Sequence, residues 1–443
     1  MKKILSNLAI IFLSFLLIFQ GLFLWISPGI LKKREKIEEF NTQDMIKKIF
    51  TPRYILANFS PKNHGLIFKI SNYWKEDLDK IGKILSQTGL DETEEISMEE
   101  YMALQEKPSI VYRFSQVMDG RVFINVMDYE RKNRDIIKGN FSEIYFSQDG
   151  DVILHSADKN YKLKYEEEDF VKDRLTELAK SDYLDVLNFK EFYGINKNIY
   201  LPKDKIIYLR DISYVNEVSK LNNLQKANMA MKFLSKDIDY IKEIKDQEGN
   251  TYVYGPSFLK ILDRGLIAYK NTDQVKKEDS QKYENLILAC NFIGSKTGKT
   301  DGFYFSGYNI QNNDDFNLNF EFREDGIPLI FTEDKKDYIN LKISSKQITE
   351  YQEIYRRSEE GEGVIKMPIR TKKLEDIILE NPQIFSEGIE GALKNIGGVS
   401  LVYLDLNEKN LKAGLKISYK NKSYYYSYEA EKFIEVKNGL AKS

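Results

Sequence analysis

The sequence predicts an α+β protein, in which an N-terminal transmembrane helix is followed by antiparallel-sheet lobes with packed helices. Three observations predict it. Residues 8–26 form an uncharged and mostly apolar stretch. Short runs rich in β-branched and aromatic residues recur along the remaining chain, which is typical of strands. Between those runs, apolar residues spaced three and four apart indicate amphipathic helices.

The apolar stretch is long enough to cross a bilayer. Its nineteen residues would span roughly 29 Å at about 1.5 Å per residue, which matches the hydrocarbon core. No small-residue cleavage site and no lipobox cysteine follow it, and Ser27, Pro28 and Gly29 are expected to end the helix after Trp25. We therefore expect a retained transmembrane helix. A cleaved signal peptide stays open as the alternative.

The orientation of this anchor follows from the length of its flanks more than from their charge. Lys2 and Lys3 precede the stretch, whereas four cations lie within residues 32–36 after it. Long polar domains translocate largely regardless of charge, so a short basic start normally stays inside. We expect a single-pass protein of the cell membrane, with a cytoplasmic N-terminus and an extracytoplasmic bulk.

Asn7, Ser14 and Gly21 recur every seven residues, so they form one stripe along the anchor helix. In lipid, helices associate through small residues that allow close packing and through polar side chains that find partners. The stripe is therefore the predicted transmembrane partner face. The alternative is that isolated small and polar residues are tolerated in any anchor, with the serine hydroxyl bonded to its own backbone.

The composition bounds what the rest of the chain can be. Hydrophobic residues make up 42% of the chain, so the exterior can build real cores. The 66 Lys and Arg nearly cancel the 68 Asp and Glu without a basic block, which argues against nucleic acid as a partner. We expect six segments: a cytoplasmic tip (1–7), the transmembrane anchor (8–26), a juxtamembrane linker or helix (27–50), an N-terminal α+β region (51–205), a central α+β lobe (206–370) and a C-terminal α+β lobe (371–443).

The N-terminal region reads as a strand and a helix, followed by several strands. Trp74, Leu78, Ile81 and Ile84 fall on one helix face, and the acidic run at 91–101 reads as a solvated helix start. Further on, we expect strands at 109–114, 121–126, 142–147 and 152–156, a helix within 167–187, and a loop at 195–205.

Two Asp-Gly pairs predict hairpins, because a type I′ turn needs positive φ at both central positions. They are Asp149-Gly150 and Asp325-Gly326, and residues 144–165 can be laid over 320–343 as a suggestive internal repeat. Two unrelated hairpins would give the same pattern. A last group of strands at 399–406 and 413–430, turning at Asn421, completes an α+β class with helices on one face of the sheets.

The stretch "GSKTGKT" at 294–300 resembles a phosphate-binding loop but fails its spacing. That motif needs four residues between its glycines so that its amides can ring a phosphate, and Gly294 leaves the loop one residue short of Gly298. The residues that follow read as a strand, whereas such a loop must open a helix. We expect a hairpin loop instead.

The sequence holds few residues for catalysis or metal binding. His64 and His155 are the only histidines, and neither has a Cys or His neighbour at metal-ligand spacing. Cys290 lies in an apolar run and is expected to be a buried core residue. With 68 acids, a pair of carboxylates can always be found, so such a pair predicts nothing by itself. We expect no catalytic residues, no cofactor and no metal.

Several stretches resemble the YycH family of Gram-positive bacteria. Residues 234–271 look like the family's run that ends in aliphatic-x-Tyr-x-Asn, and residues 316–331 are similar to its hairpin with Gly-x-Pro. Residues 348–357 and 399–406 sit where the family has an aliphatic-x-x-Tyr-x-Arg segment and a late strand. The likeness covers the anchor and most of the chain after residue 205. The shorter relative YycI shares the topology.

The resemblance implies a regulator of an essential cell-envelope two-component system, and it implies no catalytic residues. The leading hypothesis is a membrane-anchored extracytoplasmic regulator, not an enzyme, that binds and modulates a sensor histidine kinase, with a YycI-like protein as a further partner. The alternative is an extracytoplasmic protein that binds or hydrolyses cell-wall polymer. A purely structural envelope protein is the third hypothesis.

Overall fold

The structure, a computed structural model, describes residues 40–87, 94–127, 139–156, 159–165, 169–273, 278–312, 315–332, 337–359 and 365–436. The chain divides into two units, residues 1–41 and 42–443, and every described helix and strand belongs to the second. The predicted anchor and its stripe, Asn7, Ser14 and Gly21, lie outside the described residues. Among the residues that are described, no helix is both long enough and apolar enough to span a membrane.

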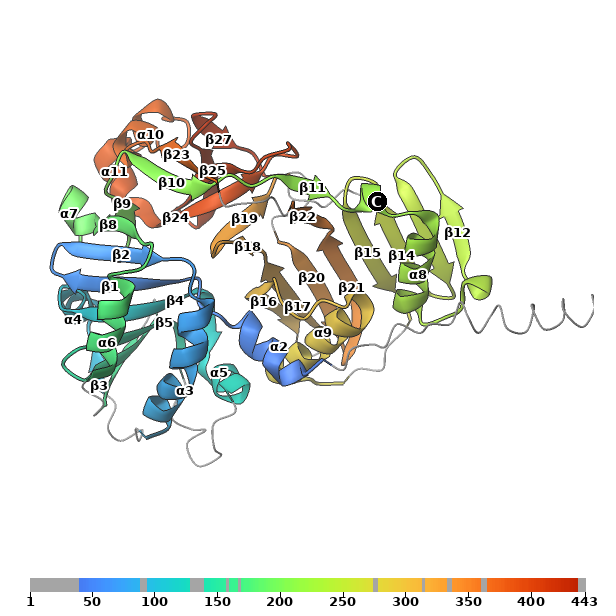
Figure 1. Cartoon of the computed structure of the whole chain (residues 1–443), viewed down its shortest axis with the longest axis horizontal. Coiled ribbons are helices and arrows are strands. Elements are labelled where there is room, and N and C mark those ends of the chain that lie inside the picture. Colours follow the sequence, from blue (N-terminus) through green and yellow to red (C-terminus); the bar gives the residue numbers. More distant parts are fainter. Residues whose placement is uncertain are drawn as a thin grey trace, which may run out of the picture. The chain divides into compact units, whose positions relative to one another are not determined.

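The first of three large sheets, called the N-terminal sheet, is built from antiparallel neighbours in the order β3-β7-β6-β5-β4-β1-β2-β8-β9 (Figure 1). Its strands are β1 (Tyr54–Ser60), β2 (Asn63–Ile67), β3 (Glu94–Ile96), β4 (Ser109–Asp119), β5 (Asn140–Ser147), β6 (Asp151–His155), β7 (Asn160–Lys164), β8 (Leu184–Asn188) and β9 (Tyr200–Pro202). The short helix α7 (Phe189–Tyr193) follows β8.

Helices cover both faces of the N-terminal sheet, so the expectation of helices on one face is wrong for this sheet. On one face, Trp74 of α3 (Ser71–Gln87) contacts Tyr112, and α6 (Asp169–Leu178) packs against β1 and β4. On the other, Tyr101 of α4 (Met98–Leu104) packs on Tyr145. Because both faces are covered, the central strands are buried along most of their length rather than alternating.

Residues 121–126, predicted to be a strand, belong to helix α5 (Gly120–Met127). The carboxylate of Asp119 accepts hydrogen bonds from the main-chain N–H groups of Arg121 and Val122, which caps the start of the helix. Six of its eight residues are buried. When a helix is apolar on nearly every side, its sequence shows no alternation of apolar and polar residues at helical spacing. The β-branched residues of the segment then predict a strand.

The Asp-Gly hairpins both form, but only one has the predicted turn. Asp325 and Gly326 both have positive φ, as a type I′ turn requires. At the other pair only Gly150 does, and its N–H bonds to the carbonyl of Ser147. That turn is therefore a type I turn followed by a left-handed glycine. The turn at Asn421 also has the type I′ signature.

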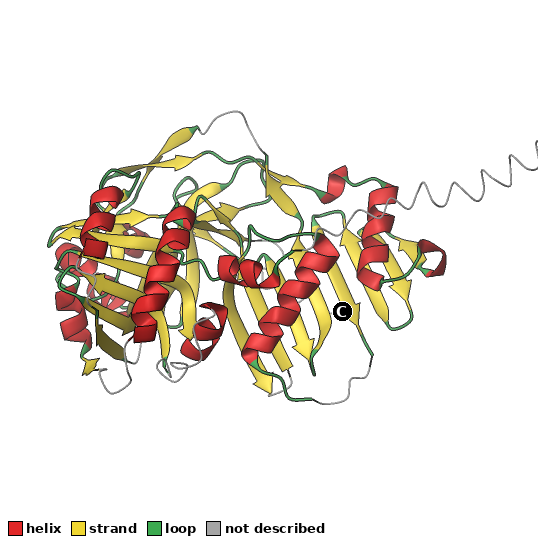
Figure 2. Cartoon of the chain, turned by 60° about the horizontal axis from the view of Figure 1, so that its bottom comes forward, coloured by secondary structure: helices red, strands yellow, loops and turns green. Residues whose placement is uncertain are grey.

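The second large sheet, called the central sheet, has the strand order β12-β13-β14-β15-β21-β20-β17-β16. Its inward residues are buried and its outward residues are partly exposed, as along β17 and β20. Helices α8 (Asn223–Leu234) and α9 (Lys282–Thr297) lie over the inward face (Figures 1 and 2). The strands are β12 (Lys242–Lys245), β13 (Gly249–Tyr254), β14 (Ser257–Leu262), β15 (Leu266–Asn271), β16 (Tyr304–Asn312), β17 (Asp315–Glu321), β20 (Ile339–Ser344) and β21 (Gln347–Ile354).

The third large sheet, called the C-terminal sheet, has the order β18-β19-β24-β25-β26-β27, with β19 parallel to β24. Two ribbons, β10–β23 and β11–β22, pair residues 206–216 with residues 356–370. The strands are β10 (Ile206–Arg210), β11 (Tyr214–Asn216), β18 (Arg323–Glu324), β19 (Ile327–Phe331), β22 (Arg356–Ser358), β23 (Lys366–Arg370), β24 (Ile396–Asp405), β25 (Lys412–Tyr419), β26 (Lys422–Ser427) and β27 (Lys432–Ile434). The remaining helices of the described residues after residue 205 are η3 (Val218–Lys220), η4 (Ile238–Tyr240), α10 (Leu374–Glu380) and α11 (Gly388–Asn395).

The two segments of the suggested repeat have different topologies. In the first, β5, β6 and β7 are consecutive neighbours in one sheet. In the second, β17 pairs directly with β20 in the central sheet, while the hairpin β18–β19 between them belongs to the C-terminal sheet. The pattern in the sequence therefore comes from two unrelated hairpins, the alternative that the sequence left open.

The segment expected to be a juxtamembrane linker or helix ends in α2 (Thr42–Ile49), which is part of the second unit. Its buried face, Met45, Ile46 and Ile49, packs toward α9 and α5. The predicted division of the exterior at residues 205 and 370 stays a prediction.

Candidate functional site

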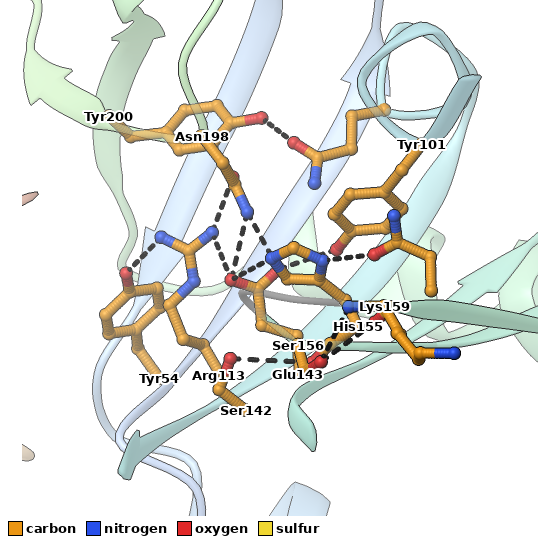
Figure 3. Close-up of polar contacts among 12 residues, drawn as sticks. Tyr54, Tyr101, Arg113, Ser142, Glu143, His155, Ser156, Lys159, Asn198 and Tyr200 are labelled. Atoms are coloured by element: carbon orange, nitrogen blue, oxygen red, sulfur yellow. Dashed lines mark hydrogen bonds and ion pairs between the residues drawn. The ribbon is translucent and has the colours of Figure 1, made fainter. Parts of the chain in front are cut away.

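The candidate site is a cavity of about 440 Å³, bordered by the N-terminal sheet, the loop at 196–199 and residues 396–399 of β24. Strand register places its polar groups: Arg113 of β4 is opposite Glu143 of β5, which is opposite His155 of β6. Opposite residues of neighbouring strands project from the same face, so the three side chains form one row (Figure 3).

Glu143 is a buried carboxylate whose two oxygens are both engaged. It accepts from Arg113 Nη2 at 2.7 Å, from the Tyr101 hydroxyl at 2.6 Å and from the Asn198 amide at 3.0 Å (Figure 3). Burial alone would raise the pKa of Glu143, but Arg113, His155 and these hydrogen bonds outweigh it and hold the pKa below its usual value. Glu143 is therefore a charged anchor for its neighbours.

The guanidinium of Arg113 is hydrogen-bonded to protein groups other than Glu143 as well. Its Nη1 donates to the Tyr54 hydroxyl at 2.9 Å and its Nη2 to the Asn198 carbonyl oxygen at 2.5 Å. Burial would lower the pKa of Arg113, yet Glu143 raises it above the ordinary arginine value. The two terminal nitrogens of Arg113 are thus bonded to protein groups around the cavity wall, whereas its buried Nε has no hydrogen-bond partner among the described residues.

The ring of His155 is oriented by a hydrogen bond through Nδ1. Its Nδ1 lies 2.5 Å from Asn160 Oδ1, and the amide nitrogen of Asn160 donates to the carbonyl of Ile96, which assigns the oxygen to the ring. Nδ1 therefore carries the proton, while Nε2 lies 4.0 Å from Glu143 Oε1. The ring stacks on Tyr101 at 4.3 Å. The histidine completes the polar row and fills a packed position.

The cavity does not bring a nucleophile to this histidine. The hydroxyl of Ser142, the nearest candidate on β5, points to the main-chain oxygen of His155 at 3.5 Å and not to its ring (Figure 3). A serine nucleophile needs a hydrogen bond to the nitrogen of its base. Ser142 and His155 therefore lack the geometry of a nucleophile–base pair.

Lys197 closes the cavity by joining the N-terminal and C-terminal sheets. Its ammonium donates to the carbonyls of Leu393, Lys394 and Ile396 at 3.0, 2.6 and 2.5 Å. These carbonyls lie at the end of α11, where a cation is favoured by the helix dipole. Burial lowers the pKa of Lys197. The three N–H groups of the ammonium are bonded to these three carbonyls, so they are not available to a ligand.

A second polar cluster joins all three sheets. Arg323 of β18 donates to the carbonyls of Thr51 and Pro52 at 3.1 and 2.7 Å and to the hydroxyl of Ser115 at 3.0 Å. Its Nε contacts Glu321 of β17 at 2.6 Å. Arg53, which precedes β1, donates to the carbonyl of Leu401 on β24 at 2.8 Å. Charged groups at the sheet junctions therefore serve as fasteners.

The look-alike of a phosphate-binding loop ends a helix instead of opening one. Residues 294–297 are the last turn of α9, and Gly298 ends it with a left-handed conformation, so the expected hairpin loop is wrong. A strand follows, as expected. Lys299, the residue after Gly298, pairs with the buried carboxylate of Glu353. This carboxylate raises the pKa of Lys299, although burial alone would lower it.

The other residues singled out in the sequence are structural where they are described. His64 is buried in β2 with its Nδ1 2.8 Å from Asn58, and burial lowers its pKa. Cys290 is buried in α9. Within the described ranges, no group of three or more His, Cys, Asp and Glu side chains could hold a metal ion. The predicted partner face, Asn7, Ser14 and Gly21, lies outside those ranges.

Sequence reasoning missed the row of Arg113, Glu143 and His155. A signal was present, because each is a charged or ionisable residue inside an otherwise apolar strand. The three strands must be aligned in register before the residues meet, and register was not predicted.

Comparison with known proteins gives a fold. No family model and no curated protein matches the sequence. The structure is similar to the crystal structure of YycH from Bacillus subtilis, with a TM-score of 0.57 and 12% sequence identity, over 86% of this chain and 96% of that chain. At this identity the similarity concerns architecture. The chain has a YycH-like fold.

Proposed function

We propose that this chain is a membrane-anchored extracytoplasmic regulator that binds and modulates the sensor histidine kinase of a cell-envelope two-component system. The observation that carries the proposal is the YycH-like fold, which extends over 86% of the chain. Stretches of the sequence, such as residues 234–271, also resemble the YycH family. Fold and sequence pattern therefore support the same role.

The geometry of the cavity argues against the hydrolytic form of the cell-wall alternative. A glycoside hydrolase needs one carboxylate free to donate a proton and a second one near it. Glu143 instead stays charged and spends both oxygens on Arg113, Tyr101 and Asn198. The row supports the sheet, so we infer that the chain acts through binding and not through turnover.

The anchor belongs to the proposal as well. Residues 8–26 would hold the exterior at the membrane, where the kinase is also embedded. We propose that Asn7, Ser14 and Gly21 form the face that meets the partner helix. Interhelical hydrogen bonds in membranes contribute about 0.6 kcal/mol each on average, so the three residues must act together.

The test measures association of the full chain with a histidine kinase recovered with it from crosslinked membranes. We expect co-purification from detergent-solubilised membranes, and loss of a bacterial two-hybrid signal when Asn7, Ser14 and Gly21 are all replaced by leucine. The matched control replaces Phe12, Leu16 and Phe23 by alanine, because these lie roughly 160–200° from the stripe.

Membrane insertion and protein level are matched in the two triple variants. Equal loss of signal in both would mean that the stripe is merely tolerated polarity. Absence of any histidine kinase from the crosslinked material would refute the regulatory proposal itself. Protease added to intact protoplasts should digest the exterior, and protection of the exterior would refute the proposed orientation.

A further inference from the structure

The ribbon of β10 and β23 has a strand edge that is open for pairing at Ile206 and Tyr208, whereas at Arg210 the carbonyl on this edge accepts from the hydroxyl of Tyr403. The main-chain N–H of Thr371 bonds to the carbonyl of Lys205, and the N–H of Asp211 bonds to the carbonyl of Ile365. These bonds fix which residues of β10 point at β23, because the direction alternates along an antiparallel pair. The main-chain groups of Ile206, Tyr208 and Arg210 therefore point to the opposite edge. Among the described strands, only β23 pairs with β10.

The two edges of this ribbon differ in how they are protected. On β23, the outward positions are Lys366, Pro368 and Arg370, and proline and charged residues are the usual guards against unwanted strand pairing. On β10, the outward positions begin with Ile206 and Tyr208, whose side chains are 49% and 64% exposed. An exposed edge that carries apolar side chains is a template for another strand.

The sequence of this edge is complementary to itself. Residues 203–211 read "KDKIIYLRD". When two copies are laid antiparallel with Ile207 opposite Ile207, Asp204 faces Arg210, Lys203 faces Asp211, and Ile206 faces Tyr208. Each of these pairs occurs twice across the two-fold axis. Opposite charges and aromatic–β-branched pairs are the cross-strand pairs that stabilise antiparallel strands.

We propose that β10 is the site at which a second copy of this chain docks, so that two ribbons form one sheet in the order β23-β10-β10-β23. The register brings the outward main-chain groups of Ile206 and Tyr208 onto those of the second copy, and pairs the charges at both ends. Such an interface is isologous and closes at two copies. It concerns this chain alone and does not rest on the kinase.

The surroundings of β10 leave room for this pairing. Residues 206–210 border a groove of about 230 Å³. Asp204 and Asp211 are exposed, and Lys203 pairs with Asp185 at 3.2 Å with about half of its side chain in solvent. Arg210 lies 4.0 Å from Glu324 and Asp325, and its carbonyl accepts from Tyr403. Asp211 also accepts from the amide of Asn410 at 3.1 Å, so pairing with a second copy would exchange intramolecular partners at the charged ends of the strand for those of the second copy.

The test is zero-length carbodiimide crosslinking of the full chain in detergent micelles, with equal amounts of ¹⁴N- and ¹⁵N-labelled protein. The expected product joins Lys203 or Lys205 to Asp211 in peptides of mixed label. The intramolecular Lys203–Asp185 pair is the internal standard for the reaction. Because the strand pairing is short, we expect the yield to rise with protein concentration from about 10 to about 300 μM.

Two variants act on the edge without touching the β10–β23 ladder. Tyr208→Pro removes an outward N–H and should abolish the mixed-label product. Asp204→Arg places like charges opposite each other twice and should reduce the product about tenfold. The control is Leu224→Lys, which removes a side chain of equal exposure, 65%, from α8 and should change nothing.

Charge exchange between copies separates pairing from misfolding. Asp204→Arg and Arg210→Asp chains should each give about a tenth of the product alone, yet pair with each other when they are mixed, because every charge pair is then restored. Recovery of the mixed-label product in that mixture supports the proposal. Absence of the mixed-label product from that mixture would overturn the proposal, and so would an undiminished product with Tyr208→Pro. Binding of the kinase at this edge, by a chain that forms no mixed-label product, would overturn it as well.

Discussion

Replacing Glu143 should destabilise the N-terminal sheet more than its single charge suggests. The carboxylate is 4% exposed and neutralises Arg113 at 2.7 Å, while Tyr101 and Asn198 also donate to it. Glu143→Leu strands the guanidinium in the interior, and breaking a buried ion pair from one side costs about 3–5 kcal/mol of the free energy of unfolding. We expect a loss of about 4 kcal/mol.

The double variant Glu143→Leu with Arg113→Met should be more stable than Glu143→Leu alone. It no longer buries an uncompensated charge, and a buried ion pair replaced by apolar residues of similar volume is often neutral. The hydroxyl of Tyr101 and the amide of Asn198 still lose an acceptor, at about 1–3 kcal/mol together. The double variant should therefore be about 2 kcal/mol more stable than Glu143→Leu alone.

Trp74 reports on this sheet directly. It is buried in α3 with its ring 5.5 Å from that of Tyr112. Trp25 is the other tryptophan of the chain, so a Trp25→Phe background leaves Trp74 as the reporter in equilibrium unfolding with urea. At an m-value of about 3 kcal/mol per molar, Glu143→Leu should lower the midpoint by about 1 M or more. An unchanged midpoint for Glu143→Leu, or a double variant that is no more stable than Glu143→Leu alone, would refute the reasoning.

Three further outcomes are expected. Lys299→Met should cost about 3–5 kcal/mol because it leaves a buried carboxylate unpaired, whereas Lys270→Met, at a half-exposed ion pair, should cost about 1 kcal/mol or less in the same urea titration. Cys290 should not react with a thiol reagent at pH 8 until urea unfolds the chain, because burial raises its pKa, and fast labelling of the native protein would contradict this. Glu143 and Glu321 have folded-state pKa values below the usual 4.5, so the stability that they contribute is present above pH 4.5 and is lost as the pH falls through those lowered values; a midpoint that stays constant down to pH 3 would contradict the sign.

The class of the fold could be predicted because most elements carry a clear period. The helix with Trp74 and Ile81 on one face forms at 71–87, and both side chains are buried. The helix α5 was missed because Val122, Phe123 and Ile124 are all buried, and a helix buried on every side has no polar stripe to reveal it. The strands predicted at 109–114, 142–147 and 152–156 do form, as parts of β4, β5 and β6, although their burial on both faces left no alternation to show how they pack.

The candidate site depends on pairings that are remote in sequence. The row of Arg113, Glu143 and His155 arises only when β4, β5 and β6 lie side by side in one register. Lys197 reaches carbonyls almost two hundred residues further along the chain. Composition and local pattern contain neither the register nor these distances, so the sequence could indicate which residues are ionisable and not which of them meet.

The fasteners between the sheets predict that the exterior moves as one body. Lys197 and Arg53 donate to carbonyls at the end of α11 and on β24, and Arg323 donates to carbonyls before β1. Separation of the sheets would exchange these hydrogen bonds for bonds to water, at about 1.5–3 kcal/mol for each cation. A partner should therefore sense the exposed surface of the exterior and not a cleft that opens between its sheets. Native-state hydrogen exchange should show β4, β17 and β24 opening with similar free energies, because the junctions link them. Exchange of β24 through a separate opening several kcal/mol easier than that of β4 would show that the fasteners do not couple the sheets.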